Sequence, residues 1–188
     1  MNTKSDLPSI RALTASFPGN DWETISTDTL FDEHGRLLTL NRSPIKHLVE
    51  RGGVYAILLP ADWFSPSRTL PLHAPQRYKG EMINFEFDLP TFTADGYGII
   101  YVGRTMDLYK RIRQHLSHGE RSAGGQVKYG LYDCGLYADP DAALHALRKH
   151  GRIVFTILSG SENCANRDLL EMSLCVRFAP PFNIKSER

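Results

Sequence analysis

The sequence predicts an α+β fold built around one small β-sheet. Three short apolar runs, at residues 53–60, 98–105 and 152–159, have the length and composition of buried strands. Stretches that fit helices follow the second and third runs, and another precedes the third. This order of elements in the C-terminal two thirds is typical of helices packed on a single small sheet.

The composition is that of a globular protein, because 41% of the 188 residues are hydrophobic and 23% are charged. No apolar run is long enough to span a bilayer, and the N-terminus lacks the apolar region of a secretory signal. Three scattered cysteines without zinc-ligand spacing are typical of a reducing compartment. We therefore expect a cytoplasmic protein without membrane contact. A net charge of +1 neither indicates nor excludes a nucleic-acid ligand.

Residues 1–52 are interpreted as an N-terminal extension with helical and hairpin segments. Apolar residues on one side of 5–17 predict a short helix there, and the His-Gly turn within 29–40 predicts a hairpin. Residues 43–53 predict a second helix, because a serine cap and Pro44 open the segment and two glycines close it.

Two predicted strands flank a long insertion. The run GVYAILLP (53–60) is a buried strand closed by proline, and GIIYVGRT (98–105) is a second one. Within the intervening residues 61–97, apolar and polar residues alternate over 83–89. Alternation of period two indicates a half-exposed strand.

Three helices and a strand complete the predicted order. Asp107 is a natural N-cap for a helix to about residue 118, whose Leu108, Ile112 and Leu116 form a core stripe. Residues 140–151 predict a helix that begins at a proline and ends at a glycine. The strand over 152–159 is followed by a helix within 166–183 that two prolines stop.

A group of polar side chains is expected where the second buried strand meets its helix. Tyr101 lies on the strand, Arg104 follows near its end, and Arg111 and His115 are four residues apart on one side of the helix. Arginine forks match phosphate oxygens, so this combination suits a phosphodiester. Glu171 borders an apolar stripe of the last helix, where a carboxylate needs an arginine or a metal ion as its partner.

These residues resemble the GIY-YIG nuclease superfamily, and in organisation they are closest to its type II restriction endonuclease branch. The resemblance rests on GVY (53–55), YVG (101–103), the spacing of two arginines and a histidine over 104–115, Glu171, and the closing P-x-F-N (180–183). Each motif alone is weak, whereas their order and spacing together are specific.

The resemblance implies a fold and a domain division. The expected core is an antiparallel three-stranded sheet flanked by helices, in a catalytic domain over residues 53–188. Family members usually join the two motif strands by a short loop, so residues 61–97 are a candidate DNA-recognition element. Its basic residues Arg68, Arg77 and Lys79 are expected to contact DNA.

The resemblance also implies the roles of the site residues. The implied catalytic residues are Tyr55, Tyr101, Arg111, His115, Glu171 and Asn183. Glu171 would hold one divalent ion, Mg²⁺ or Mn²⁺, in each active site. Arg104, Lys110 and Arg113 are further expected to bind phosphate. A tyrosine hydroxyl, with Tyr55 preferred, would activate the attacking water with help from His115, which requires a lowered tyrosine pKa.

The expected function is metal-dependent, site-specific cleavage of double-stranded DNA in restriction or genome defence. Cutting both strands of a palindrome would favour a homodimer. One alternative is a structure-selective or single-strand nuclease of repair or mobile elements, and another is a non-catalytic nucleic-acid-binding module. Structural roles also stay open for single residues, including pairing of Glu171 with Arg167 and a turn role for Asn183.

Overall fold

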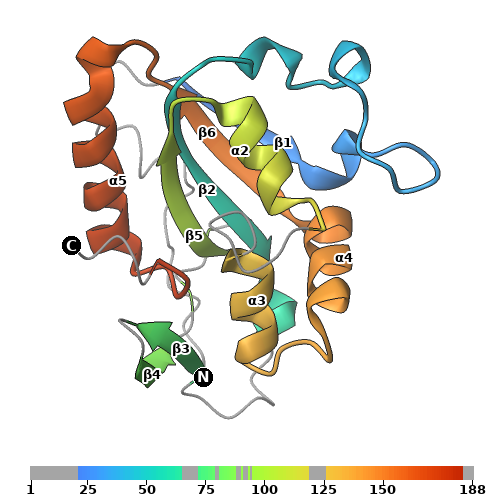
Figure 1. The fold of residues 1–188 in the computed structure, drawn as a ribbon, viewed down its shortest axis with the longest axis vertical. Helices are drawn as coiled ribbons and strands as arrows, with labels where there is room; N and C mark the ends of the chain where they lie inside the picture. Colours follow the sequence, from blue (N-terminus) through green and yellow to red (C-terminus); the bar gives the residue numbers. More distant parts are fainter. Residues whose placement is uncertain are drawn as a thin grey trace.

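A computed structural model describes residues 21–64, 72–78, 81–87, 90, 93, 95–118 and 126–183, with the main chain alone at 63, 64, 72–78, 81–87 and 126 (Figure 1). The helix expected at 5–17 lies outside these residues. None of the helices in the described part is long and apolar enough to span a membrane.

The three predicted buried strands form one antiparallel sheet, and the α+β class is confirmed. They are β2 (Gly53–Pro60), β5 (Tyr97–Thr105) and β6 (Arg152–Ile157). The prediction of three strands was wrong, because β1 (Trp22–Ser26) pairs with β6 and gives the order β1-β6-β2-β5. Trp22 and Ile25 are the only large apolar residues of this short strand. Its composition is therefore not that of a buried strand, and pairing with β6 makes the segment extended.

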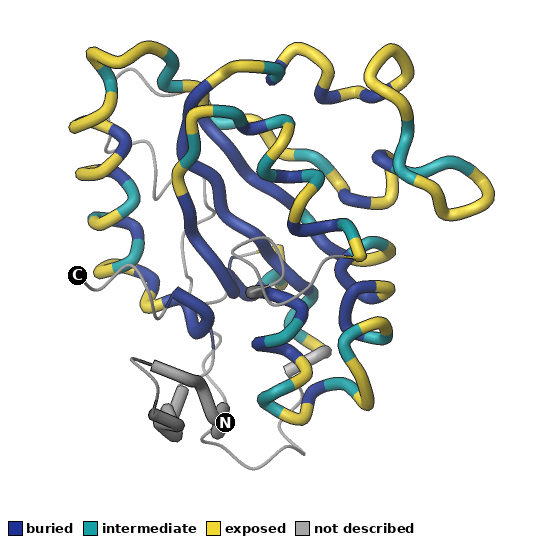
Figure 2. Tube along the Cα trace, viewed as in Figure 1, coloured by how far each residue is buried: buried dark blue, intermediate teal, exposed yellow. Residues whose placement is uncertain are grey.

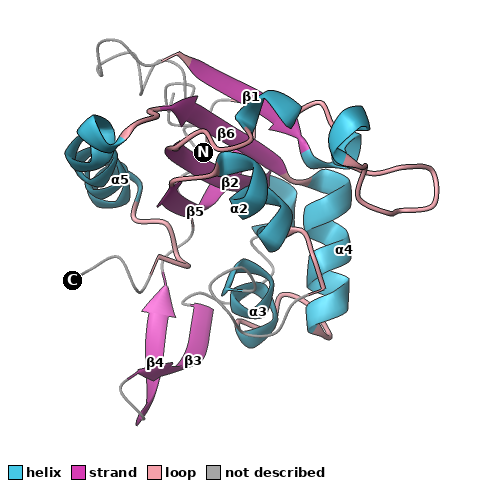
Figure 3. Cartoon of the chain, turned by 45° about the horizontal axis from the view of Figure 1, so that its top comes forward, coloured by secondary structure: helices cyan, strands magenta, loops and turns pink. Residues whose placement is uncertain are grey.

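Side chains of β2 alternate between two cores on opposite faces of the sheet. One face is covered by α2 (Leu108–His115), α3 (Gln126–Asp133) and α4 (Pro140–His150), and the other by α5 (Cys164–Phe178) (Figures 1 and 3). Figure 2 shows the strands as the buried centre between partly exposed helices. Tyr55 and Tyr101 belong to the core under α2, α3 and α4, whereas Glu171 lies on α5, the helix that covers the opposite face.

Helix boundaries follow local chemistry. The side chain of Asp107 accepts a hydrogen bond from the main-chain N–H of Lys110 at 2.9 Å, so the predicted N-cap of α2 is confirmed. The predicted stripe of Leu108, Ile112 and Leu116 is buried. Helix α2 ends at His115, three residues earlier than expected. The predicted helix over 140–151 is confirmed as α4, and α3 lies before it at residues where no element was predicted.

Residues 21–52 pack against the same core. The predicted turn within 29–40 forms one antiparallel bridge between Phe31 and Leu37. The predicted helix over 43–53 was wrong, since its only helical residues are one short turn around Lys46–Leu48. Ile45 and Leu48 are both buried, and their spacing of three matches the period of a 3-10 turn. The short 3-10 segments are η1 (Thr27–Leu30), η2 (Leu40–Arg42), η3 (Lys46–Leu48), η4 (Ala61–Phe64) and η5 (Ser161–Asn163).

The insertion between β2 and β5 contains a separate two-stranded sheet. Its strands are β3 (Leu72–Tyr78) and β4 (Glu81–Phe87), which pair antiparallel. The strand predicted at 83–89 therefore exists with an earlier start. Its partner β3 carries Pro75, a residue that argues against a strand in a sequence pattern.

The outer edge of β5 is covered by the chain that follows α5. The main-chain N–H of Phe182 donates to the carbonyl of Ile100 at 3.2 Å. The amide side chain of Asn183 bonds both main-chain groups of Val102: its oxygen accepts from the N–H at 2.7 Å, and its nitrogen donates to the carbonyl. The C-terminal segment thereby holds β5 at Ile100 and Val102, on either side of Tyr101.

Candidate active site

Tyr55 is the centre of a buried hydrogen-bonded group. Its side chain is completely buried, and its hydroxyl oxygen lies 2.8 Å from Nε2 of His115. Nε of Arg111 donates to the same oxygen at 3.1 Å. Because Arg111 and His115 are four residues apart on α2, one face of this short helix brings both to β2. Three of the predicted site residues therefore meet directly.

The chemistry of these three groups restricts the direction of the hydrogen bonds. A guanidinium can only donate, so the hydroxyl oxygen of Tyr55 is the acceptor in its bond with Arg111. The hydroxyl of Tyr55 can then donate to Nε2 of His115 when this ring nitrogen carries no proton. The arrangement forms a path along which a proton can pass from Tyr55 to His115.

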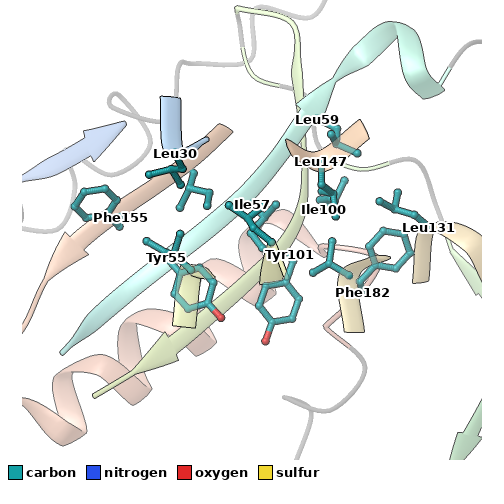
Figure 4. Close-up of a cluster of buried hydrophobic side chains, with 14 of the residues drawn as sticks. Leu30, Tyr55, Ile57, Leu59, Ile100, Tyr101, Leu131, Leu147, Phe155 and Phe182 are labelled. Carbon is teal, nitrogen blue, oxygen red and sulfur yellow. The ribbon is translucent and has the colours of Figure 1, made fainter. Parts of the chain in front are cut away.

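Strand pairing places Tyr101 beside this path. Tyr55 pairs with Gly103 in the sheet, and Tyr101, two residues earlier on β5, shares its face. The ring centroids of Tyr55 and Tyr101 are 6.0 Å apart, and that of Tyr101 is 5.2 Å from that of His115. In Figure 4 both tyrosine hydroxyls point to the same side of the core.

Gly103 makes room for both tyrosines. A Cβ atom at this position would lie 2.7 Å from the hydroxyl oxygen of Tyr55 and 2.7 Å from Cε1 of Tyr101. Both distances are shorter than van der Waals contact, so a larger residue would displace a ring. The glycine of the YVG motif is thus required by packing within the site.

Burial keeps the two hydroxyls protonated. Loss of solvent raises the pKa of Tyr55 well above its ordinary value, Tyr101 raises it further, and the charge of Arg111 offsets only part. Burial also raises the pKa of Tyr101, again against Arg111. The lowered tyrosine pKa that the sequence interpretation required is not found, because desolvation outweighs the neighbouring cation.

Glu171 lies on α5 and forms an ion pair with Arg104 of β5. Its charge also contributes slightly to the raised pKa of Tyr101. Nε of Arg104 donates to Oε2 of Glu171 at 2.8 Å, and the same guanidinium contacts Oδ1 of Asp168 at 2.6 Å. Burial raises the pKa of Glu171 although Arg104 opposes the shift. The charge of Arg104 thus offsets only part of the cost of burying the Glu171 carboxylate.

The surroundings of Glu171 fit a sparsely held divalent cation. Within the described residues no group of three or more His, Cys, Asp or Glu side chains forms a metal cage. Mg²⁺ typically needs only one or two carboxylates, and takes its other ligands from water and substrate phosphates. Glu171 is 16% exposed, so its partly compensated charge remains reachable from solvent.

Arg167, which the sequence left open as a structural partner of Glu171, is buried instead. Its side chain is 2% exposed, and it donates to the carbonyl oxygens of Leu158 at 2.5 Å and Gly160 at 2.9 Å. It also lies 2.8 Å from Sδ of Met106. Arg167 therefore turns inward and does not pair with Glu171. It joins the start of α5 to the turns that follow β5 and β6, one helical turn before Glu171.

The remaining predicted site residues are distributed differently. Asn183 uses its amide on Val102 and supports β5. Arg113 donates to the carbonyl of Leu38 at 2.6 Å and lies over the ring of Tyr109, so it braces α2. Lys110 is exposed near the start of α2. Arg68 and Lys79 lie outside the described residues, and of Arg77 only the main chain in β3 is described.

Compared with protein-family models, with curated proteins and with solved structures, the chain matches none of them.

Proposed function

We propose that this protein is a metal-dependent endonuclease that hydrolyses phosphodiester bonds of double-stranded DNA. The observation that carries the proposal is the buried pair of Tyr55 and His115, bonded to Arg111 and placed on the same face as Tyr101. Such a hydrolysis requires a group that takes a proton from water, a cation that binds phosphate oxygens, and a carboxylate for a metal ion. Tyr55 with His115, Arg111 and Glu171 are the candidates for these three roles. The resemblance in sequence motifs leads to the same reaction.

In the proposed reaction Tyr55 relays a proton and does not persist as an anion. A water molecule attacks phosphorus and gives its proton to the oxygen of Tyr55, while the hydroxyl proton of Tyr55 passes to Nε2 of His115. The bond from phosphorus to the 3′-oxygen breaks, and that oxygen takes a proton from solvent. A relay agrees with the raised pKa of Tyr55, because the phenol need not ionise beforehand.

Arg111 and Glu171 would act on the negative charge that develops on the phosphoryl oxygens. The guanidinium of Arg111 is half-buried, where an ionic hydrogen bond to a phosphate oxygen is stronger than in water. Glu171 would hold one divalent cation, Mg²⁺ or Mn²⁺, which would offset charge on the phosphate and assist departure of the 3′-oxygen. Arg104 would then share its guanidinium between Asp168 and the incoming phosphate.

The test is cleavage of several unrelated plasmids with and without Mg²⁺, comparing wild type with Glu171→Gln. Glu33→Gln is the matched control, because Glu33 is an exposed carboxylate in the turn between Phe31 and Leu37. We expect discrete Mg²⁺-dependent fragments from wild type and control, and none from Glu171→Gln.

Other substrates separate the remaining alternatives. Cutting confined to single-stranded or branched DNA would replace the duplex-specific proposal with a structure-selective nuclease. If wild type binds DNA and cuts none of these substrates, the enzymatic proposal is wrong and a binding module takes its place.

A further inference from the structure

A segment of the N-terminal extension runs along the flank of α2. At one end, the guanidinium of Arg113 on α2 donates to the carbonyl of Leu38 at 2.6 Å. At the other end, the main-chain N–H of Leu108 donates to the carbonyl of Arg51 at 2.9 Å. Residues 38–51 therefore follow α2 from its C-terminal half back to its first residue, as Figure 1 also shows.

Buried side chains fix this segment in place. Ser43, Ile45 and Leu48 are buried, and Ile45 and Leu48 belong to the core that contains Tyr55. Arg42 and Lys46 alternate with them and are exposed. The main chain of the segment is thus already ordered, and its basic side chains are exposed to solvent. Binding a ligand there costs little main-chain conformational entropy.

The strip carries excess positive charge. We call the four exposed cations Arg42, Lys46, Arg51 and Lys110 the α2 flank, and none of them forms an ion pair with any described residue. Glu50 is the only carboxylate in residues 38–51 and in α2. The whole chain carries a net charge of only +1, so positive charge is concentrated beside the helix that holds Arg111 and His115.

We propose that the α2 flank binds the phosphate backbone of duplex DNA and aligns it over the site. Helix α2 has eight residues and is about 12 Å long, which spans about three phosphates of one strand. Backbone contacts of this kind set the register of a duplex without reading its sequence. The inference rests on the proposed function. It extends to Arg42, Lys46 and Arg51 the phosphate contact that the sequence predicted for Lys110.

The test measures binding of a fluorescein-labelled duplex of about 30 base pairs in EDTA, by anisotropy across a salt series. The variant is Arg42→Gln with Lys46→Gln. The matched control is Lys149→Gln with Arg177→Gln, which removes the same charge from exposed positions on α4 and α5. We expect the slope of log affinity against log salt to fall by up to about 2 in the variant, because each lost phosphate contact removes about 0.9. The control should keep the wild-type slope.

The outcomes distinguish this inference from the proposed function. Weaker binding of the variant with a reduced slope, and an unchanged control, supports a backbone contact. If wild type binds the duplex and the variant behaves like the control, the α2 flank is not the DNA surface, although the nuclease proposal stands. If wild type binds no duplex DNA at any salt concentration, both proposals are wrong.

Discussion

The hydroxyl of Tyr55 and Nε2 of His115 lie 2.8 Å apart inside the protein, joined across sixty residues of sequence. Each residue comes from a different element, one from β2 and one from the last position of α2. Neither element could lose its packing without separating the pair. The integrity of the site is therefore coupled to the core beneath α2.

Replacing Tyr55 with phenylalanine tests the relay. The ring volume is kept, but Arg111 and His115 lose their common partner, so cleavage should fall by at least about 100-fold, a usual contribution of proton transfer. Steady-state cleavage rates and thermal unfolding should be measured together. Tyr109→Phe is the control, because the ring of Tyr109 lies under the guanidinium of Arg113 and its hydroxyl has no role in the proposed reaction. Equal activity of both variants would contradict the relay.

Substituting Gly103 with alanine should disturb both tyrosines at once. The added Cβ would stand 2.7 Å from the Tyr55 hydroxyl and from a carbon of Tyr101, so one ring must move. We expect a loss of stability of about 1–3 kcal/mol, as for overpacked cores, together with loss of cleavage. Urea denaturation and a cleavage assay measure the two effects. Wild-type values in both would show that the strands relax around the methyl group.

The stability of the protein should depend on pH through Glu171. Burial raises the pKa of this carboxyl above its ordinary value of 4.5, so folding favours its protonated form. Its contribution to stability is complete below pH 4.5 and is lost as pH rises through the raised pKa. Glu171→Gln should remove this component, so the unfolding free energy of wild type relative to Glu171→Gln should fall between acidic and neutral pH. Urea titrations at several pH values measure it, and a difference independent of pH would refute the assignment.

The side chain of Arg167 should contribute strongly to the free energy of unfolding. Arg167→Ala leaves the carbonyls of Leu158 and Gly160 without their donor in a buried place, and we expect a loss of about 3 kcal/mol. The exposed Lys149 on α4 offers the control, and Lys149→Ala should change stability by less than about 0.5 kcal/mol. Chemical denaturation of the two variants is the measurement. A small effect at Arg167 would mean that water replaces its contacts.

The central strands could be predicted because their signals are local. GVYAILLP is apolar, and RIVFTILS has an apolar centre over 153–155, as expected of strands buried on both faces. Asp107 and Pro140 mark helix starts by their own chemistry. By contrast, β1 (Trp22–Ser26) exists because β6 offers it a partner. The failed helix over 43–53 had suitable end residues, but Ile45 and Leu48 are placed by tertiary contact and not by helical propensity.

The site could be predicted in part for the same reason. Periodicity puts Arg111 and His115 on one side of a helix, and strand alternation puts Tyr101 and Gly103 on one face. The partners of the charged groups could not be predicted, because they depend on how α5 meets the turns after β5 and β6. Glu171 therefore contacts Arg104, and Arg167 turns to main-chain carbonyls. The tyrosine pKa values were also inaccessible, since they reflect depth of burial.

The amide of Asn183 on Val102 has a consequence for how molecules of this protein meet. β5 is the outermost strand on its side of the sheet, and open strand edges are templates on which other chains polymerise. Asn183 presents one acceptor and one donor to Val102 as a neighbouring strand would. The main-chain N–H of Phe182 bonds the carbonyl of Ile100 in the same way. The chain after α5 thus acts as a built-in terminator of the sheet, which opposes edge-to-edge aggregation at these positions.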